Sequence, residues 1–357
     1  MTKLKGGIMR SYNYENKWEQ FMTPDIVSML TQIHEYKGKQ NLFIESSAEA
    51  LTGLVEIAKI QSTEASNKIE GIYTSDERIK KLALAKTNPK NRAEEEIAGY
   101  RDVLNAIHSN HDGIPLKPNI ILQLHRDLYR FNTVTYGGQY KNVDNVIAKE
   151  DESGVRFQPI KAREVPASME NLCSAFNEAI ALEAINPLLA VPMFILDFLC
   201  IHPFSSGNGR MSRLLTLLLL YRSGYIVGKY ISIEKMIETT KESYYDALQK
   251  SSLGWHENNN DYAPFVKYML SVILASHREF ATHVQIMIEN KLSKPERIAK
   301  IIEDTIGKVT KQDILDKCPD ISETTVQRTL ADLSKKRKII KMSGGRYTSY
   351  TWNREEE

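Results

Sequence analysis

The stretch that decides the fold is His202-Pro203-Phe204-Ser205-Ser206-Gly207-Asn208-Gly209-Arg210-Met211-Ser212-Arg213. A mostly apolar run, Leu188 to Ile201, precedes it, and a second apolar run, Leu214 to Tyr221, follows. We therefore expect two buried segments joined by a polar loop. The backbone groups of a buried loop need hydrogen-bond partners. A loop that opens a helix presents free N–H groups and the positive end of the helix dipole, so this pattern predicts an anion site.

The side chains of this loop fit an anion with several oxygens. Arg210 and Arg213 are three residues apart, so they are neighbours on the helix surface and can reach the same oxyanions. His202 precedes the loop, where a general base could reach an incoming hydroxyl. Glycines let the backbone approach a ligand closely, and the expected anion cradle consists of Gly207, Asn208 and Gly209. These residues suggest transfer from a nucleotide polyphosphate.

The same residues resemble the signature of the Fic family (filamentation induced by cyclic AMP), His-Pro-Phe-x-Asp/Glu-Gly-Asn-Gly-Arg-x-x-Arg. The resemblance implies a protein adenylyltransferase, which moves AMP from ATP to a Ser, Thr or Tyr hydroxyl of a protein. His202 would accept the proton of that hydroxyl, the hydroxyl would attack the α-phosphate, and pyrophosphate would leave. Arg210 and Arg213 would hold the phosphate tail.

One fixed position departs from the signature, because Ser206 stands where the family has an acidic residue. The family's acid holds Mg²⁺, a hard cation that prefers carboxylate and phosphate oxygens, and a neutral hydroxyl is a much weaker ligand. Three outcomes stay open: Mg²⁺ held by phosphates and waters alone, a slower enzyme, or a different reaction. The different reaction could use another donor nucleotide or remove AMP from a modified target.

A second motif, Ser66-Asn67-Lys68-Ile69-Glu70-Gly71, lies far upstream. Ser66 and Glu70 share one helix face, and Gly71 suits a helix C-terminus. Taken alone, this pattern is explained by a solvated Glu at a helix end. It is also similar to the family's inhibitory motif, Ser/Thr-x-x-x-Glu-Gly/Asn, which implies that Glu70 pairs with Arg213 and keeps it from the γ-phosphate. One guanidinium cannot serve two anions in one geometry. If the chain removes AMP, Glu70 would instead position a water.

Apolar residues at helical spacing predict a mainly α-helical fold with a Fic-type helical bundle core. The first helix should begin at Thr23-Pro24 and stop near Gly38. The expected helices that follow cover Ala48–Ser66, Arg92–Ile107, Pro118–Tyr129, Ser168–Glu183 and Tyr262–Met287. Glu94-Glu95-Glu96 should lie in a solvated first turn. His108, His111 and His125 lie near helix ends, where caps or surface positions are more common than metal ligands.

The helical period breaks after Tyr136-Gly137-Gly138-Gln139-Tyr140-Lys141. The following residues predict a small β-hairpin with its turn near Ser153-Gly154. It resembles the flap of Fic proteins, on which a target segment docks by strand addition. Tyr244 and Tyr245 are adjacent helix residues, of which one should face the core. The resemblance implies that a Tyr here lines the adenine pocket.

Composition shifts near Asn290, and residues 290–357 contain 15 Lys and Arg against 11 Asp and Glu, a net charge of 15 − 11 = +4. Three expected helices and a hairpin with Gly344-Gly345 at its turn resemble a winged helix-turn-helix. Its second helix, Ser322 to Lys335, would enter a DNA major groove, and phosphates could contact Arg328, Lys335, Lys336, Arg337 and Lys338. The same fold could serve as a docking or dimer-supporting module. The second functional hypothesis is therefore a nucleotide-sensing DNA-binding regulator with little turnover.

The expected domains are an N-terminal helical region with the inhibitory helix (1–110), a Fic core (111–288) and a winged-helix-like domain (289–357). The whole chain carries a net charge of only +2, which argues against strong membrane or nucleic-acid electrostatics overall. Three scattered cysteines and the N-terminal residues suit a cytoplasmic protein without a membrane partner. The expected partners are ATP, an unknown protein target that could be the chain itself, and, from the resemblance, a second copy in a homodimer.

Overall fold

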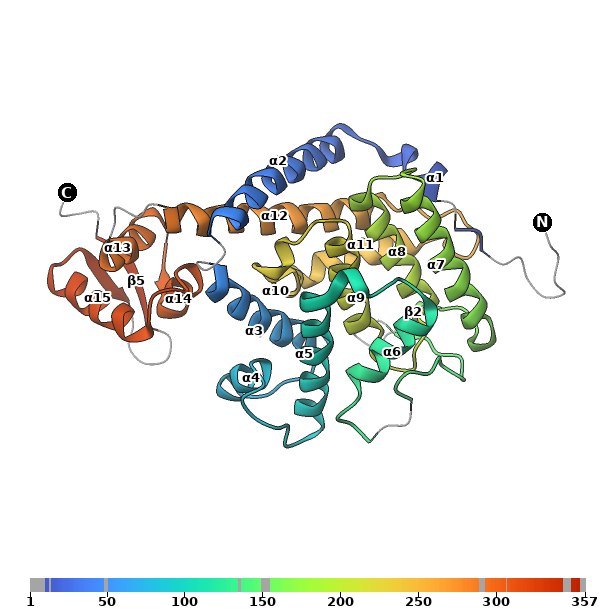
Figure 1. Ribbon diagram of the computed structural model, residues 1–357, viewed down its shortest axis with the longest axis horizontal. Coiled ribbons are helices and arrows are strands. Elements are labelled where there is room, and N and C mark those ends of the chain that lie inside the picture. The colour runs from blue at the N-terminus through green and yellow to red at the C-terminus, as the bar shows by residue number, and fades with distance from the viewer. Residues whose placement is uncertain are drawn as a thin grey trace.

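The computed structural model describes residues 10–12, 14–47, 51–133, 136–148, 155–288, 293–305, 307–342 and 348–353. In these ranges the chain is mainly α-helical, which confirms the predicted fold class (Figure 1). None of the described helices is both long enough and apolar enough to cross a membrane.

The helices before the central motif are α1 (Tyr14–Lys17), α2 (Pro24–Ser47), α3 (Thr52–Ile69), α4 (Asp76–Ala83), α5 (Arg92–Asn110), α6 (Pro118–Leu128) and α7 (Val165–Ala181). The helices that carry and follow the motif are α8 (Pro187–Ile201), α9 (Asn208–Arg222), α10 (Ile233–Thr239), α11 (Lys241–Ser252) and α12 (Ala263–Ile288). The predicted start of α3 at Ala48 lies outside the described residues, and this helix ends at Ile69, three residues later than expected.

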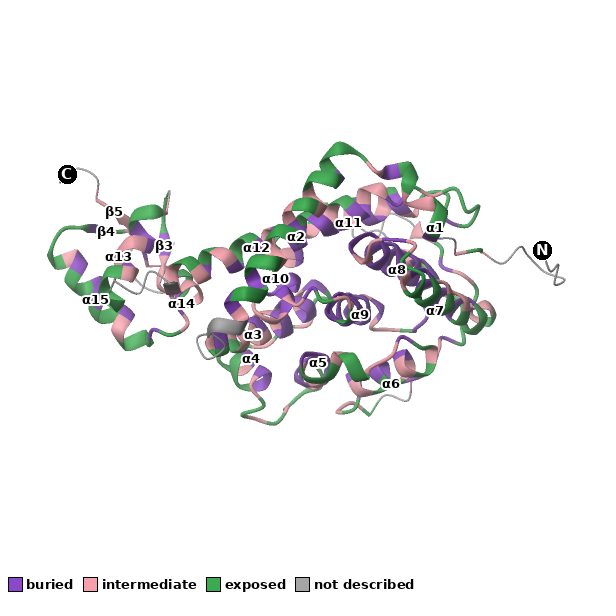
Figure 2. Ribbon diagram, turned by 45° about the horizontal axis from the view of Figure 1, so that its top comes forward, coloured by how far each residue is buried: buried purple, intermediate pink, exposed green. Residues whose placement is uncertain are grey.

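The centre of the fold consists of α8 and α9, which appear almost wholly buried in Figure 2. Asn186 caps α8 by accepting a hydrogen bond from the N–H of Leu188 at 2.9 Å. A helix that is apolar on all sides belongs in a core, and the neighbours of α8 are α7, α9, α11 and α12. The loop between α8 and α9 is thereby held inside the bundle, as the two apolar runs predict.

One hydrophobic cluster extends from Tyr14 to Leu274 and takes in residues on both sides of the boundary expected at 110. Tyr100 and Leu104 of α5 belong to it together with Phe194 of α8 and Leu217 of α9. Helix α3, which carries Ser66, contributes Ile69 to the same cluster. The N-terminal helical region and the motif helices therefore share one core.

The α2 helix does not stop at Gly38, as expected, but continues to Ser47. It runs beside α12 (Figure 1), and Phe43 packs edge-on against Phe280 of α12 with ring centroids 6.3 Å apart. Glycine lowers helix propensity by only about 1 kcal/mol. Burial of the apolar residues beyond Gly38 against α12 therefore outweighs this local stop signal.

Two short strands, β1 (Ile147–Ala148) and β2 (Val155–Phe157), pair antiparallel, which confirms the predicted hairpin. The turn expected at Ser153-Gly154 lies outside the described residues. Arg156 and Phe157 place β2 beside α11 and the motif loop.

The C-terminal module consists of α13 (Lys294–Asp304), β3 (Val309–Thr310), α14 (Lys311–Lys317), α15 (Glu323–Lys335), β4 (Ile339–Met342) and β5 (Ser349–Trp352). Its strands form a sheet in the order β3-β5-β4 around a separate small core. The turn predicted at Gly344-Gly345 lies outside the described residues. The module sits at the end of α12 (Figure 1), where His283 of α12 faces the carbonyl of Lys317 at 3.0 Å.

Candidate active site

A cavity of about 180 Å³ lies where α3, α8, α9, α11 and the hairpin meet. Six of the residues predicted from the sequence line it: Glu70, His202, Gly209, Arg213, Tyr244 and Tyr245. Glu70 therefore forms part of the wall of the cavity that His202 and Arg213 line.

His202 ends α8 with a left-handed backbone, φ 51° and ψ 62°, and its N–H donates to the carbonyl of Phe198 at 2.9 Å. This conformation is uncommon for a residue other than glycine. It turns the chain out of the helix and leaves the imidazole facing the cavity. Burial, helped by the positive charge of Lys141, lowers the pKa of His202 to about 4. The imidazole is therefore neutral at pH 7, the form that can accept a proton.

Arg213 is 3% exposed and is held by the C-terminal end of α3. Its Nη2 donates to Glu70 Oε1 at 2.7 Å and to the carbonyl of Ser66 at 2.8 Å. Its Nε donates to Ser66 Oγ at 2.8 Å. Burial opposes the charge of Arg213, but the Glu70 carboxylate together with Tyr244 and Tyr100 raises the pKa of Arg213. Ser66 and Glu70 thus bind Arg213, the arginine that was expected to hold the phosphate tail.

Glu70 also lies against the first turn of α9. A Cβ atom built on Gly209 would lie 2.2 Å from Glu70 Oε1, so only glycine leaves room for this carboxylate. The first N–H groups of a helix have no partner within the helix and attract negative charge. Gly71 follows with φ 76°, a left-handed conformation that ends the turn. The carboxylate therefore occupies the region where the sequence predicts an anion.

Asn208 holds the motif loop closed. Its Oδ1 accepts from the N–H of Phe204 at 2.9 Å, and its Nδ2 donates to the carbonyl of Phe204 at 2.8 Å. The side chain is therefore used within the loop, which leaves its backbone N–H for the predicted cradle. Gly207 caps the N-terminus of α9 with φ 82°. A Cβ atom built on it would lie 2.9 Å from the Tyr129 hydroxyl oxygen.

Arg210 does not line the cavity. It is 2% exposed, and its Nη2 donates to Glu96 Oε2 at 2.6 Å and to the Tyr129 hydroxyl at 2.8 Å. Its Nη1 donates to Asn67 Oδ1 at 3.4 Å. The structure therefore separates the two motif arginines, which helix spacing alone had placed on one ligand.

Ser206 does not line the cavity either. Its Oγ accepts a hydrogen bond from the Tyr129 hydroxyl at 3.1 Å, and its carbonyl lies 3.0 Å from His125 Nε2. Within the described ranges, no three His, Cys, Asp or Glu side chains are close enough to hold a metal ion. A neutral, already bonded hydroxyl is a poor ligand for Mg²⁺. The residues at this position therefore do not fit a protein-bound Mg²⁺ of the kind that the resemblance implies.

Tyr244 and Tyr245 line the opposite wall of the cavity, and Tyr244 is the more buried of the two at 3% exposure. Arg156 of β2 covers Tyr245, with its guanidinium 4.7 Å from the ring centroid. Arg156 Nη2 donates to the Tyr245 carbonyl at 3.0 Å, and its Nε donates to Gln249 Oε1 at 3.2 Å. An arginine of the hairpin thus ties the flap to the helix that carries the tyrosines.

Two expectations about charged and polar residues near helix ends are wrong. Glu94 and Glu96 are not solvated but 3% and 8% exposed, because Glu94 pairs with Arg78 and Glu96 with Arg210. His125 is 0% exposed and stacks on Phe204 with ring centroids 3.7 Å apart. No local pattern marks these residues, because their partners are distant in sequence. Their position on the inner face of a helix is the one signal that the sequence offers.

Comparisons with known proteins show what this chain is similar to. Residues 115–220 match the model of the Fic/DOC family. The chain is 25% identical over 187 residues to the protein adenylyltransferase fic-1 of Caenorhabditis elegans, covering 52% of this chain and 32% of that protein. It is 29% identical over 164 residues to the protein adenylyltransferase Fic of Culex quinquefasciatus, covering 45% and 28%.

Solved structures show the same fold. A Fic family protein from Desulfovibrio desulfuricans G20 superposes with a TM-score of 0.61 at 20% identity, covering 94% of this chain and 98% of that one. A Fic-domain-containing signalling protein from Bacteroides thetaiotaomicron superposes with a TM-score of 0.56 at 22% identity, covering 71% and 95%.

Residues 115–220, which include the motif from His202 to Arg213, are thus similar to the Fic/DOC family, and the solved structures share the fold of the chain. The chain spans about a third or less of the length of the two curated relatives described above.

Proposed function

We propose that this chain is a protein adenylyltransferase that moves AMP from ATP to a hydroxyl of a protein, and that Glu70 restrains it. The observation that supports this proposal most directly is the contact of Glu70 with Arg213 at 2.7 Å inside the cavity that His202 lines. The names of the relatives agree with the proposed activity.

In the proposed reaction, neutral His202 accepts the proton of a Ser, Thr or Tyr hydroxyl on the target. The hydroxyl oxygen bonds to the α-phosphorus of ATP, and the bond to pyrophosphate breaks. Arg213 and the free N–H groups at the start of α9 stabilise the phosphate oxygens, since preorganised donors supply most of the catalysis in such reactions. Tyr244 and Tyr245 would contact the adenine ring of ATP. Arg213 can do this only after Glu70 has left it.

The test is the incorporation of α-labelled ATP into protein by the wild type, by Glu70→Gly, and by Glu70→Gly combined with His202→Ala. We expect Glu70→Gly to raise labelling, of a target or of the chain itself, by about tenfold or more. His202→Ala should abolish labelling while ATP still binds. ATP binding without label in any variant would reject this donor, and labelled GTP, CTP and UTP would then reveal another one. Release of AMP from a modified target by the wild type would favour the reverse activity.

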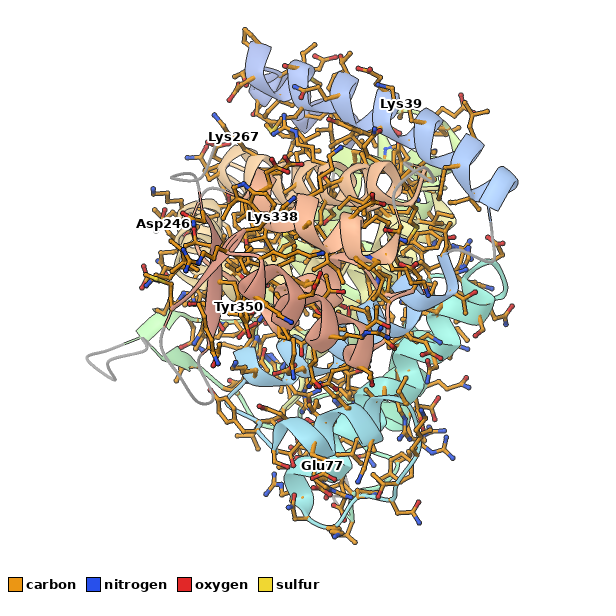
Figure 3. The ribbon with its side chains drawn as sticks, turned by 90° about the vertical axis from the view of Figure 1, so that its left-hand side faces the viewer. Lys39, Glu77, Asp246, Lys267, Lys338 and Tyr350 are labelled. Atoms are coloured by element: carbon orange, nitrogen blue, oxygen red, sulfur yellow. The ribbon has the colours of Figure 1, made fainter. Side chains whose placement is uncertain are left out.

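A second function is proposed for the C-terminal module, because of its exposed basic ridge. The element order helix, strand, helix, helix, strand, strand matches a winged helix. The exposed basic residues are Arg328 in the middle of α15, Lys335 at its end, and Lys336, Arg337 and Lys338 in the turn before β4. Figure 3 looks onto this module, with Lys338 labelled. Such a ridge suits the phosphates of duplex DNA.

A mobility-shift assay with genomic fragments, with and without ATP, tests DNA binding. Binding should fall when Lys335, Arg337 and Lys338 are all changed to Glu, and the salt dependence should weaken. A matched control changes the exposed lysines Lys117, Lys161 and Lys250 to Glu, which belong to the helical bundle and not to the module. Equal binding by both triple variants would reject the ridge as the DNA surface.

A further inference from the structure

The segment Tyr136–Lys141, which we call the brace, precedes the hairpin and contacts the motif loop at several points. The N–H of Gly138 donates to His125 Nδ1 at 3.0 Å. Since this nitrogen accepts, the neutral ring carries its proton on Nε2, which donates to the Ser206 carbonyl at 3.0 Å. The N–H of Lys141 donates to the carbonyl of Pro203 at 2.8 Å. The brace therefore supplies partners that the backbone of a buried loop requires.

Lys141 adds a third attachment through its side chain. Its Nζ donates to the carbonyl of Ile201 at 3.3 Å and to Asn145 Oδ1 at 2.9 Å. The residue is 3% exposed. Lys141 thus binds the carbonyls on both sides of His202, at Ile201 through its ammonium group and at Pro203 through its backbone.

These two contacts fall on the strained part of the loop. His202 has a left-handed backbone, which costs free energy and persists only where the surroundings enforce it. The carbonyl of Ile201 is one of the last in α8, which have no N–H partner within the helix, and Lys141 supplies its hydrogen bond. The ammonium charge also lies close enough to His202 to oppose its protonation.

We propose that Lys141 is a positioning residue of the transfer reaction, which holds the left-handed turn at His202 and so fixes the orientation of its imidazole. The proposal rests on the proposed function for its role in catalysis. It does not make Lys141 a catalytic residue, because Lys141 does not line the cavity.

The charged groups around His202 come from four elements and act in both directions. Lys141 opposes protonation, and Glu70 of α3 favours it. Arg213 of α9 and Arg156 of β2 line the same cavity. In a Glu70→Gly background, the carboxylate is absent, so it no longer offsets the effect of Lys141 on the pKa of His202. Removal of its charge should then be measurable at the imidazole itself.

The first measurement is the pKa of His202 by NMR of protein labelled with ¹⁵N in its histidines, with His202→Asn to assign the signal. In the Glu70→Gly background, Lys141→Met should raise this pKa by about one unit or more, toward the ordinary value of about 6.5. Lys141→Arg keeps the charge and the donors and should leave the pKa low. Lys161→Met, at an exposed lysine, is the matched control.

The second measurement is the rate of AMP transfer in the same variants as a function of pH. Lys141→Met should lower kcat by about tenfold to a hundredfold, with KM for ATP nearly unchanged, and move the acid limb of the profile upward. Lys141→Arg should restore kcat to within about threefold. A general loss of structure would change KM and kcat together and would not be rescued by arginine.

The outcomes separate this inference from the proposed function. If no variant transfers AMP but Lys141→Met still raises the pKa of His202, the influence of Lys141 on His202 is supported and the proposed AMP transfer is rejected. If transfer occurs but Lys141→Met matches Lys161→Met in pKa and kcat, Lys141 is not a positioning residue. Should Lys141→Met fail to fold, Lys141→Gln supplies the same neutral test with a donor to the Ile201 carbonyl.

Discussion

Ser206 is the residue at which this chain departs from the Fic signature, and its contacts suggest what the change does. Its hydroxyl accepts from Tyr129, whose oxygen also accepts from Arg210. Arg210 in turn bonds to Glu96. The side chain at this position therefore completes a hydrogen-bond chain from α5 to the motif loop, and a carboxylate there would be free to bind a cation with its second oxygen.

We predict that Ser206→Asp makes nucleotide binding depend on Mg²⁺. In a Glu70→Gly background that keeps Ser206, the protein should bind ATP with similar affinity in the presence of Mg²⁺ and in the presence of EDTA. The Ser206→Asp variant should bind ATP at least about tenfold more tightly with Mg²⁺ than with EDTA, since carboxylates are the ligands that Mg²⁺ prefers. Ser205→Asp adds the same charge at an exposed neighbour and is the control. Equal Mg²⁺ dependence of both variants would mean that the metal is held elsewhere.

The two hydrogen bonds of Asn208 to Phe204 lead to a stability prediction. Asn208→Ala removes both bonds and leaves the buried N–H and carbonyl of Phe204 without these partners. The free energy of unfolding should fall by about 2–4 kcal/mol, because each unsatisfied buried group costs about 1–2. Urea denaturation followed by circular dichroism measures this change. A loss below about 0.5 kcal/mol would show that water replaces the clamp.

At the scale of helices, two glycines predict opposite effects of one substitution. Gly38 lies inside α2, and a Cβ there would meet no atom within 4 Å. Gly99 lies inside α5 where it crosses α6, and a Cβ there would be 1.9 Å from the carbonyl oxygen of Leu128. Gly38 therefore has room for a side chain, whereas Gly99 has none because α5 and α6 approach each other closely there.

Gly38→Ala should therefore raise the free energy of unfolding by about 0.5–1 kcal/mol, the helix-propensity difference between alanine and glycine. Gly99→Ala should lower it by several times as much, because α5 and α6 must move apart. Thermal unfolding of the two variants in one buffer gives the comparison. The explanation fails if both substitutions shift the melting temperature in the same direction.

The α3 helix links the site to the C-terminal module. Its first turn contacts that module, since a Cβ on Gly53 would lie 3.1 Å from Pro319 Cβ. Its last turn presents Ser66 and Glu70 to Arg213. Between them, Ser62 donates to the buried Glu234 of α10 at 2.8 Å. This helix is thus fixed along its length, and any release of Glu70 must break contacts at its C-terminal end.

At the scale of the whole molecule, four histidines among the described residues have a lowered pKa because their surroundings disfavour the charged ring. Burial lowers the pKa of His108 to about 3 and that of His125, His202 and His277 to about 4. Their ordinary pKa is about 6.5. Below pH 6.5 the unfolded chain therefore binds more protons than the folded chain, and stability is lost as pH falls toward about 4. Buried Glu234, whose pKa is raised by burial, acts in the opposite direction.

We predict a steep loss of stability between about pH 6.5 and 4, with a slope of about 1.4 kcal/mol per pH unit for each histidine that is protonated only when unfolded. Urea midpoints at several pH values and constant ionic strength measure it. His277→Phe should reduce the pH dependence of the free energy of unfolding. It should also raise the free energy of unfolding at pH 7, because both ring nitrogens of His277 are buried without a hydrogen-bond partner. An unchanged slope would show that His277 does not contribute.

The sequence by itself determined the mainly helical fold, the burial of α8 and α9, the hairpin and the motif from His202 to Arg213. These features follow from local periodicity and from residue types at fixed spacing, which a single chain displays directly. The pairing of Glu70 with Arg213, 143 residues apart, was foreseen through the family's second motif and not through physical distance.

Only the tertiary structure decided which polar groups meet. Helix spacing placed Arg210 and Arg213 together, but the two side chains meet different acceptors. Glu96 and Tyr129 accept from Arg210, whereas Ser66 and Glu70 accept from Arg213. Gly38 failed to end α2 because α12 covers the residues beyond it. Lys141 and His125 gained their roles in the same way, since a buried loop takes its hydrogen-bond partners from whichever segments fold against it.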